Sequence, residues 1–173
     1  MKNMMIVMTL LGGSLLPLSA WSQECSDGIE ASTPDTQLVD NGDGTIKDTL
    51  TGLMWKKCSE GQTGLDCSGD AAGFTLQEAL NNVQSLNKSG GFAGYKDWRV
   101  PNIKELFSIV EKRCANPAVN VRFFPNTPFS SGVTSYLTSS PVADKFHSTW
   151  SVYFSYGDVF DTAAEKQAVR LVR

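Results

Sequence analysis

The stretch that decides the fold runs from residue 94 to residue 107 and reads GYKDWRVPNIKELF. Its first part, residues 95–101, is rich in aromatic and β-branched side chains and ends at a proline, which predicts a short strand. Asn102 follows, with Glu105 three positions later, and this pattern is typical of a helix N-terminus. We expect a helix from there to Arg113. Its buried face should consist of the apolar residues at helical spacing, which are Ile103, Leu106, Phe107 and Val110.

Another helix is predicted upstream, where Thr75 and Glu78 form a capping-box pattern. Gly90 and Gly91 end this segment. Its apolar residues recur every three or four positions and form one stripe, made of Leu76, Ala79, Leu80, Val83 and Leu86. A stripe of this kind is typical of a helix that packs on a core.

Short strands are predicted on both sides of the helices, because β-branched and alternating segments are bounded there by turn residues. The sequence DNGDG at residues 40–44 is the clearest turn. The order of elements predicts an α+β fold with a mainly antiparallel sheet and a long loop at 115–134. The expected strands are 38–39, 45–48, 53–57, 95–101, 136–140, 150–154, 156–160 and 168–173. The aromatic residues expected in the core are Trp55, Trp98, Phe107, Trp150 and Phe154.

The chain has 173 residues, a length typical of one domain. Residues 1–22 carry a basic start, an apolar centre and small residues, which predicts a signal peptide cleaved before Gln23, with cleavage after Ala20 as the alternative. A polar arm is expected at 23–37 and the domain at 38–173. No stable membrane span is expected after cleavage, and the expected location is the periplasm or the cell exterior.

Four cysteines follow the predicted signal, and an even number in an exported chain indicates two disulfides. Three pairings are open. The glycine-rich turn between Cys58 and Cys67 favours that pair, which leaves Cys25 with Cys114. A four-cysteine zinc site is disfavoured because the spacings contain no CxxC-type knuckle.

The formal net charge of −3 argues against a nucleic-acid partner. The aspartates of the DNGDG turn do not have the spacing of an EF-type calcium loop, so calcium is not supported and no cofactor is expected. His147 is the only histidine, and the sequence has no nucleophile elbow, P-loop or HExxH motif. We therefore expect no enzymatic activity.

Tyrosines on the later strands are the best candidates for a ligand platform, because sugars stack on aromatic rings while polar neighbours orient them. Tyr153 is predicted to lie on the sheet face opposite Trp150, and the alternative is that it only covers a sheet edge. The candidate ligand-binding residues are Tyr136, Tyr153, Tyr156, His147 and Lys145.

An ordered set of phrases resembles the bacterial family named for the C-terminal domain of the Lcl collagen-like adhesin. The resemblance implies a C-type-lectin-like fold, with two helices flanking a twisted antiparallel sheet, and the WRVPN stretch also looks like that of formylglycine-generating-enzyme-type domains. The phrases are DNGDGT at 40–45, TGLMW at 51–55, GYKDWRVPN at 94–102 with Glu105 and Leu106, FPNT at 124–127, TSS at 138–140 and VRLVR at 169–173.

The resemblance also implies binding of sulfated glycans and assembly into trimers, but this chain has no Gly-X-Y stalk and its bases are scattered. We expect an exported, non-enzymatic binding or adhesion module that recognises glycans, including sulfated or acidic polysaccharides, or surface proteins. A structural subunit of a cell-surface apparatus is one alternative, and a carboxylate-dependent hydrolase is another. The sequence does not set the oligomeric state.

Overall fold

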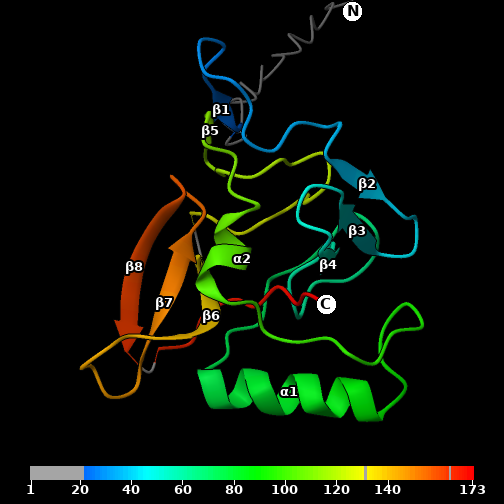
Figure 1. Ribbon diagram of the computed structural model, residues 1–173, viewed down its shortest axis with the longest axis vertical. Coiled ribbons are helices and arrows are strands. Elements are labelled where there is room, and N and C mark those ends of the chain that lie inside the picture. The colour runs from blue at the N-terminus through cyan, green and yellow to red at the C-terminus, as the bar shows by residue number, and fades with distance from the viewer. Residues whose placement is uncertain (1–21, 131, 164) are drawn as a thin grey trace, which may run out of the picture.

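The computed structural model of the chain describes residues 22–130, 132–163 and 165–173 (Figure 1). The predicted signal peptide, residues 1–22, lies outside this range except for its last residue. Within the described residues, eight strands form three small antiparallel sheets, which are accompanied by two helices. The expected α+β class with antiparallel pairing is confirmed, but the strands form three separate sheets where one was expected.

The three sheets have the strand orders β1-β5, β2-β3-β4 and β6-β7-β8. The strands are β1 (Glu24–Cys25), β2 (Leu38–Asp40), β3 (Thr45–Asp48), β4 (Met54–Lys56), β5 (Cys114–Ala115), β6 (Ser135–Pro141), β7 (Ser148–Tyr153) and β8 (Asp158–Ala163). The helices are α1 (Leu76–Lys88) and α2 (Ile103–Phe107). Figure 1 shows α2 beside the β6-β7-β8 sheet and α1 across the opposite end of the molecule from the N-terminal arm.

Helix α1 begins where its sequence predicts. The side chain of Thr75 accepts a hydrogen bond from Glu78 N at 3.3 Å, and Glu78 Oε2 accepts one from Thr75 N at 2.9 Å. Ala79 and Val83 are buried. Leu80 was expected in the same stripe but is 42% exposed, because only a narrow face of the helix packs on the core.

Helix α2 starts at the predicted cap, with Asn102 Oδ1 accepting from Glu105 N at 3.0 Å. It ends at Phe107, however, and the expected continuation to Arg113 is wrong. The chain leaves the helix because Val110 forms a β-bridge with Val119. Leu106 and Val110 are buried, whereas Ile103 and Phe107 are only half-buried.

The segments 95–101 and 168–173 were both expected to be strands, and neither forms a regular one. The C-terminal segment instead pairs with several neighbours through isolated bridges of one or two backbone hydrogen bonds. Arg99 N donates to Val172 O at 2.8 Å, Met54 N to Arg173 O at 3.0 Å, and Leu137 N to Ala168 O at 2.9 Å. The segment thus crosses the centre of the molecule and joins two of the sheets, as the red trace in Figure 1 shows.

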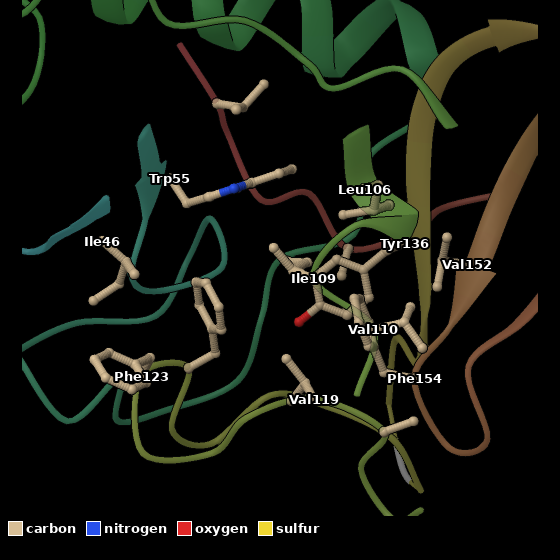
Figure 2. Packing of buried hydrophobic residues seen from close by; sticks show 14 of the residues in the cluster. Ile46, Trp55, Leu106, Ile109, Val110, Val119, Phe123, Tyr136, Val152 and Phe154 are labelled. Carbon is tan, nitrogen blue, oxygen red and sulfur yellow. The ribbon is translucent and has the colours of Figure 1, made fainter. Parts of the chain in front are cut away.

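Two hydrophobic clusters make up the core of the described residues. The first contains Trp55, Tyr136 and Phe154, and Figure 2 shows its side chains between α2, β4 and the β6-β7 pair. The second contains Trp98 and lies between α1 and the C-terminal segment. Trp55, Trp98 and Phe154 are buried as expected. Trp150 and Phe107, which were also expected in the core, are only half-buried.

All four cysteines form disulfides, which pair Cys25 with Cys114 and Cys58 with Cys67. These are the two pairs favoured from the sequence. The first bridge joins strands β1 and β5 and so ties the arm at 23–37 to the domain. Disulfides of this kind are typical of proteins from oxidising compartments.

Glu111 provides a second attachment for the arm. Glu111 is 3% exposed, and its carboxylate accepts hydrogen bonds from Ser32 N at 3.0 Å and from Thr33 N and Oγ1 at 2.9 Å each. Burial by itself would raise the pKa of Glu111, but the backbone donors of Thr33, Ser32 and Arg113 outweigh it, so the pKa lies below its ordinary value of 4.5. The ionised form of Glu111 is therefore the one that holds the arm.

A carboxylate with a lowered pKa stabilises the fold above its ordinary pKa, and this contribution is lost as the pH falls through the folded-state pKa. We expect the Glu111→Gln variant to lose about 1–3 kcal/mol of unfolding free energy at neutral pH, because it removes charge-assisted hydrogen bonds. Urea unfolding between neutral and strongly acidic pH measures this, and the difference from wild type should shrink in acid. Glu30→Gln, at an exposed position of the same arm, is the control. A pH-independent difference would contradict the assignment.

Candidate functional site

A hollow of about 770 Å³ lies between the disulfide-closed segment 58–67, with the residues that follow it up to 71, and the described residues 126–130 and 132–133. We call it the loop hollow. Amide, hydroxyl and carboxylate groups alternate with apolar side chains on its wall. The residues that matter for its chemistry are Gln62, Asp70, Asn126, Thr127, Phe129 and Ser130. This mixture of one aromatic ring with several polar groups is typical of small-ligand sites.

Hydrogen bonds hold the two walls of the loop hollow together. Gln62 Nε2 donates to Asn126 O at 2.8 Å, and Gln62 Oε1 accepts from Ser59 N at 3.0 Å. Asn126 Nδ2 donates to Asp66 O at 2.9 Å. The Cys58–Cys67 bridge closes the segment that carries Gln62 and Asp66. The walls are therefore fixed before any ligand arrives.

Arg170 lies behind this hollow and is fully buried. Its Nη2 donates to Thr127 Oγ1 at 2.9 Å and to Ser59 Oγ at 3.4 Å, and its Nη1 donates to Lys57 O. The guanidinium carbon lies 4.6 Å from the centre of the Phe124 ring and 5.8 Å from that of Tyr136. No carboxylate among the described residues pairs with it, and burial lowers the pKa of Arg170. Hydroxyls, a carbonyl and ring faces thus take the place of a counter-ion.

Tyr136 was expected as a ligand-binding ring, and the structure corrects this. It is fully buried, its hydroxyl lies 2.5 Å from Ser59 Oγ, and its ring packs edge-on against Phe154 at 4.9 Å. In the sheet it stands opposite Val152, a buried core residue. Because opposed residues of antiparallel strands share a face, Tyr136 belongs to the core face.

Tyr153 and Tyr156 lie away from the loop hollow's lining. Tyr153 is half-buried, and its ring centre lies 6.4 Å from that of Phe160, so it covers the outer part of the sheet. Tyr156 is 64% exposed and borders a shallow hollow beside Lys112 and Arg113. The two tyrosines therefore do not form one platform with Tyr136.

Lys145 and His147 flank the tip of the β6-β7 hairpin. Lys145 Nζ lies 2.6 Å from Asp161 Oδ2. Phe146 lies between them in the sequence and is 95% exposed. All three residues border a groove of about 510 Å³, which Leu76 and Leu80 of α1 also line. Asp144 and His147 have φ angles of 61° and 67°, a left-handed conformation that non-glycine residues rarely adopt. The hairpin thus presents an aromatic ring to solvent, a feature that the sequence interpretation missed.

The five sequence candidates are therefore divided among the core, the β7-β8 end of the sheet and the β6-β7 hairpin. The loop hollow contains none of them. Its residues Asn126 and Thr127 belong to the FPNT phrase, which contributed to the sequence analysis only through the family resemblance. Asp70, Phe129 and Ser130 carried no local signal, because isolated polar or aromatic residues in loops are common.

Basic residues do not gather at the loop hollow, whose described lining contains no lysine or arginine. Seven of the described basic side chains are paired locally with acids instead. The ion pairs seen among the described residues are Lys56–Glu60, Lys57–Asp40, Arg99–Glu105, Arg122–Asp35, Lys145–Asp161, Lys166–Glu78 and Arg173–Asp97. The positive charges of these seven residues are therefore largely balanced by the acids beside them.

In the described part of the chain, no group of three or more histidine, cysteine, aspartate or glutamate side chains is placed to hold a metal ion. In the turn, Asp43 Oδ1 accepts from Thr45 N at 3.0 Å and so acts as a turn cap. None of the helices described is long and apolar enough to cross a membrane.

The model of the Lcl C-terminal domain family matches residues 44–173, which is most of the chain. No curated protein matches the chain.

Removal of the Arg170 guanidinium should destabilise the fold, because Lys57 O, Ser59 Oγ and Thr127 Oγ1 would lose the donor of their hydrogen bonds. We expect Arg170→Lys to lower the unfolding free energy by about 2–4 kcal/mol, since a lysine cannot reach three acceptors in a planar fork. Urea denaturation measures the loss, and Arg113→Lys at an exposed position is the control. Equal stabilities of the two variants would show that Arg170 does not hold these loops.

Proposed function

The chain belongs to the Lcl C-terminal domain family, and from this premise we propose that it is an exported, non-enzymatic module that binds glycans through the loop hollow. The proposal includes the signal peptide at 1–22, the periplasm or cell exterior as its place of action and a C-type-lectin-like arrangement of the fold. The two disulfides support export, because such bonds persist in oxidising compartments.

The lining of the loop hollow is the observation that carries the glycan proposal. Sugars present hydroxyl groups around an apolar ring face, and the hollow offers Asp70, Asn126 and Ser130 as hydrogen-bonding partners beside the ring of Phe129. Asp70, Asn126 and Ser130 are exposed to solvent, so a ligand can reach them. The hollow is also held by a disulfide and by hydrogen bonds, which reduces the ordering that binding requires.

The chemistry of the hollow favours a neutral glycan over a sulfated one. Sulfate groups are usually held by arginine or lysine, and the described lining of the hollow has neither. Asp70 adds a negative charge that would repel a polyanion. A hydrolase mechanism that requires two carboxylates is also disfavoured here, because Asp70 is the only acid among the described lining residues.

We expect a glycan array to give its strongest signals with neutral glycans, and the Asp70→Ala variant to bind the best of them about 10–100-fold more weakly. This range corresponds to the loss of one hydrogen bond to a charged group. Isothermal titration calorimetry measures the affinity, and Asp158→Ala, an exposed acid on β8, is the matched control. Binding confined to sulfated glycans, or equal affinities of the two variants, would overturn the assignment of this hollow.

Phe146 favours a second function, contact with a surface protein or with other subunits of a cell-surface apparatus. A phenylalanine that is 95% exposed beside an apolar groove is typical of protein-binding surfaces. We expect Phe146→Ser to abolish capture of a protein partner from envelope extracts while leaving the melting temperature unchanged. Tyr156→Ser, which removes another exposed ring, is the control. A partner that is lost equally with both variants, or with neither, would argue against the hairpin as the contact.

A further inference from the structure

A second hollow, of about 420 Å³, lies on another side of the same disulfide-closed segment, and we call it the side hollow. Gln62 lines both hollows, so only the thickness of the segment around that residue separates them. Each volume falls within the range of roughly 300–1,000 Å³ in which proteins hold small ligands. The two hollows are therefore neighbours that share one wall.

The side hollow has a polar base and an apolar rim. Lys56 Nζ lies 2.5 Å from Glu60 Oε1, and the two side chains are only 14% and 11% exposed. Asn82 Nδ2 donates to Glu60 Oε2 at 3.0 Å, which fixes the carboxylate. The ring of Phe92 lies 4.5 Å from Lys56 Nζ, and Leu65 stands 59% exposed in the lining. Fixed polar groups beside exposed apolar surface resemble the chemistry of the loop hollow.

Arg170 connects the two hollows from behind. Its Nη2 donates to Thr127 Oγ1, which lines the loop hollow, and to Ser59 Oγ, which lines the side hollow. Gln62 adds a second link, because its side chain bonds Asn126 O on one side and Ser59 N on the other. The relative position of the hollows is thus set by buried bonds, and a ligand could engage both without rearranging the loops.

We infer that the two hollows are subsites of one binding site, and that its ligand is a chain of several neutral sugar units lying across the segment that carries Gln62. This inference rests on the proposed glycan-binding function. A chain that fills both subsites gains affinity because the second contact is made at high effective concentration, an effect worth roughly 10²–10⁴-fold for well-matched sites. A single sugar unit can fill only one subsite.

The test uses the full disulfide-bonded protein and oligomers of N-acetylglucosamine from one to six units, followed by the same ladder of whichever neutral sugar the array selects. We expect the affinity to rise at least tenfold between the single unit and the longer oligomers. Leu65→Ala and Phe92→Leu should remove most of this gain and leave the affinity for the single unit unchanged. Asp70→Ala should weaken the binding of every length.

The outcomes separate the two proposals. If sugars bind with an affinity that does not change with length, or if the side-hollow variants bind long oligomers as well as wild type does, the two-subsite inference is wrong and the loop hollow alone binds the ligand. If no neutral sugar binds at any length, the proposed function fails and the inference fails with it. Circular dichroism of Phe92→Leu and Leu65→Ala establishes that a loss of affinity does not reflect unfolding.

Discussion

The buried guanidinium of Arg170 is the constraint on which the arrangement of the loops depends. A charge removed from water is very unfavourable unless polar groups replace the lost hydration, and no described carboxylate does so here. Lys57 O, Ser59 Oγ and Thr127 Oγ1 must therefore stay within reach, and the rings of Phe124 and Tyr136 must stay against the guanidinium. Any displacement of these segments would leave a charge unsolvated, so one side chain fixes loops that are far apart in the sequence.

The backbone around Arg170 extends this effect to the whole domain. Lys56 N donates to Leu171 O and Glu60 N to Val169 O, while Leu137 N donates to Ala168 O. The C-terminal segment therefore connects the β2-β3-β4 sheet, the disulfide-closed segment and the β6-β7-β8 sheet, which share no strand. This explains how the two three-stranded sheets can form a single stable unit, since small isolated sheets are only marginally stable.

Features of the fold that depend on neighbouring residues in the sequence could be predicted, whereas most of those that depend on distant contacts could not. The distant Cys25–Cys114 bridge was expected only because the pairing of Cys58 with Cys67 leaves those two cysteines. The capping boxes at Thr75 and Asn102 and the short Cys58–Cys67 loop are local, and the structure contains all three. The end of α2 was misplaced because the bridge between Val110 and Val119 competes with the helix. Tyr136 has the same strand pattern as an exposed ring, and only the register opposite Val152 places it in the core. Arg170 in an alternating segment was likewise indistinguishable from a surface residue.

The same reasoning explains why the candidate site escaped the sequence analysis. The elements that support the site have strong local sequence patterns. The groups that face the ligand are single loop residues, and they come together only because the disulfide, Gln62 and Arg170 hold the loops. The charge pattern then limits what these loops can bind. Since seven of the described basic residues are paired with adjacent acids and none lines the loop hollow, the electrostatic attraction that concentrates sulfated polymers on a protein is weak at this site. Under the proposed function, affinity must come from short-range hydrogen bonds and ring contacts, which favours an extended neutral ligand that touches many groups at once over a compact charged one.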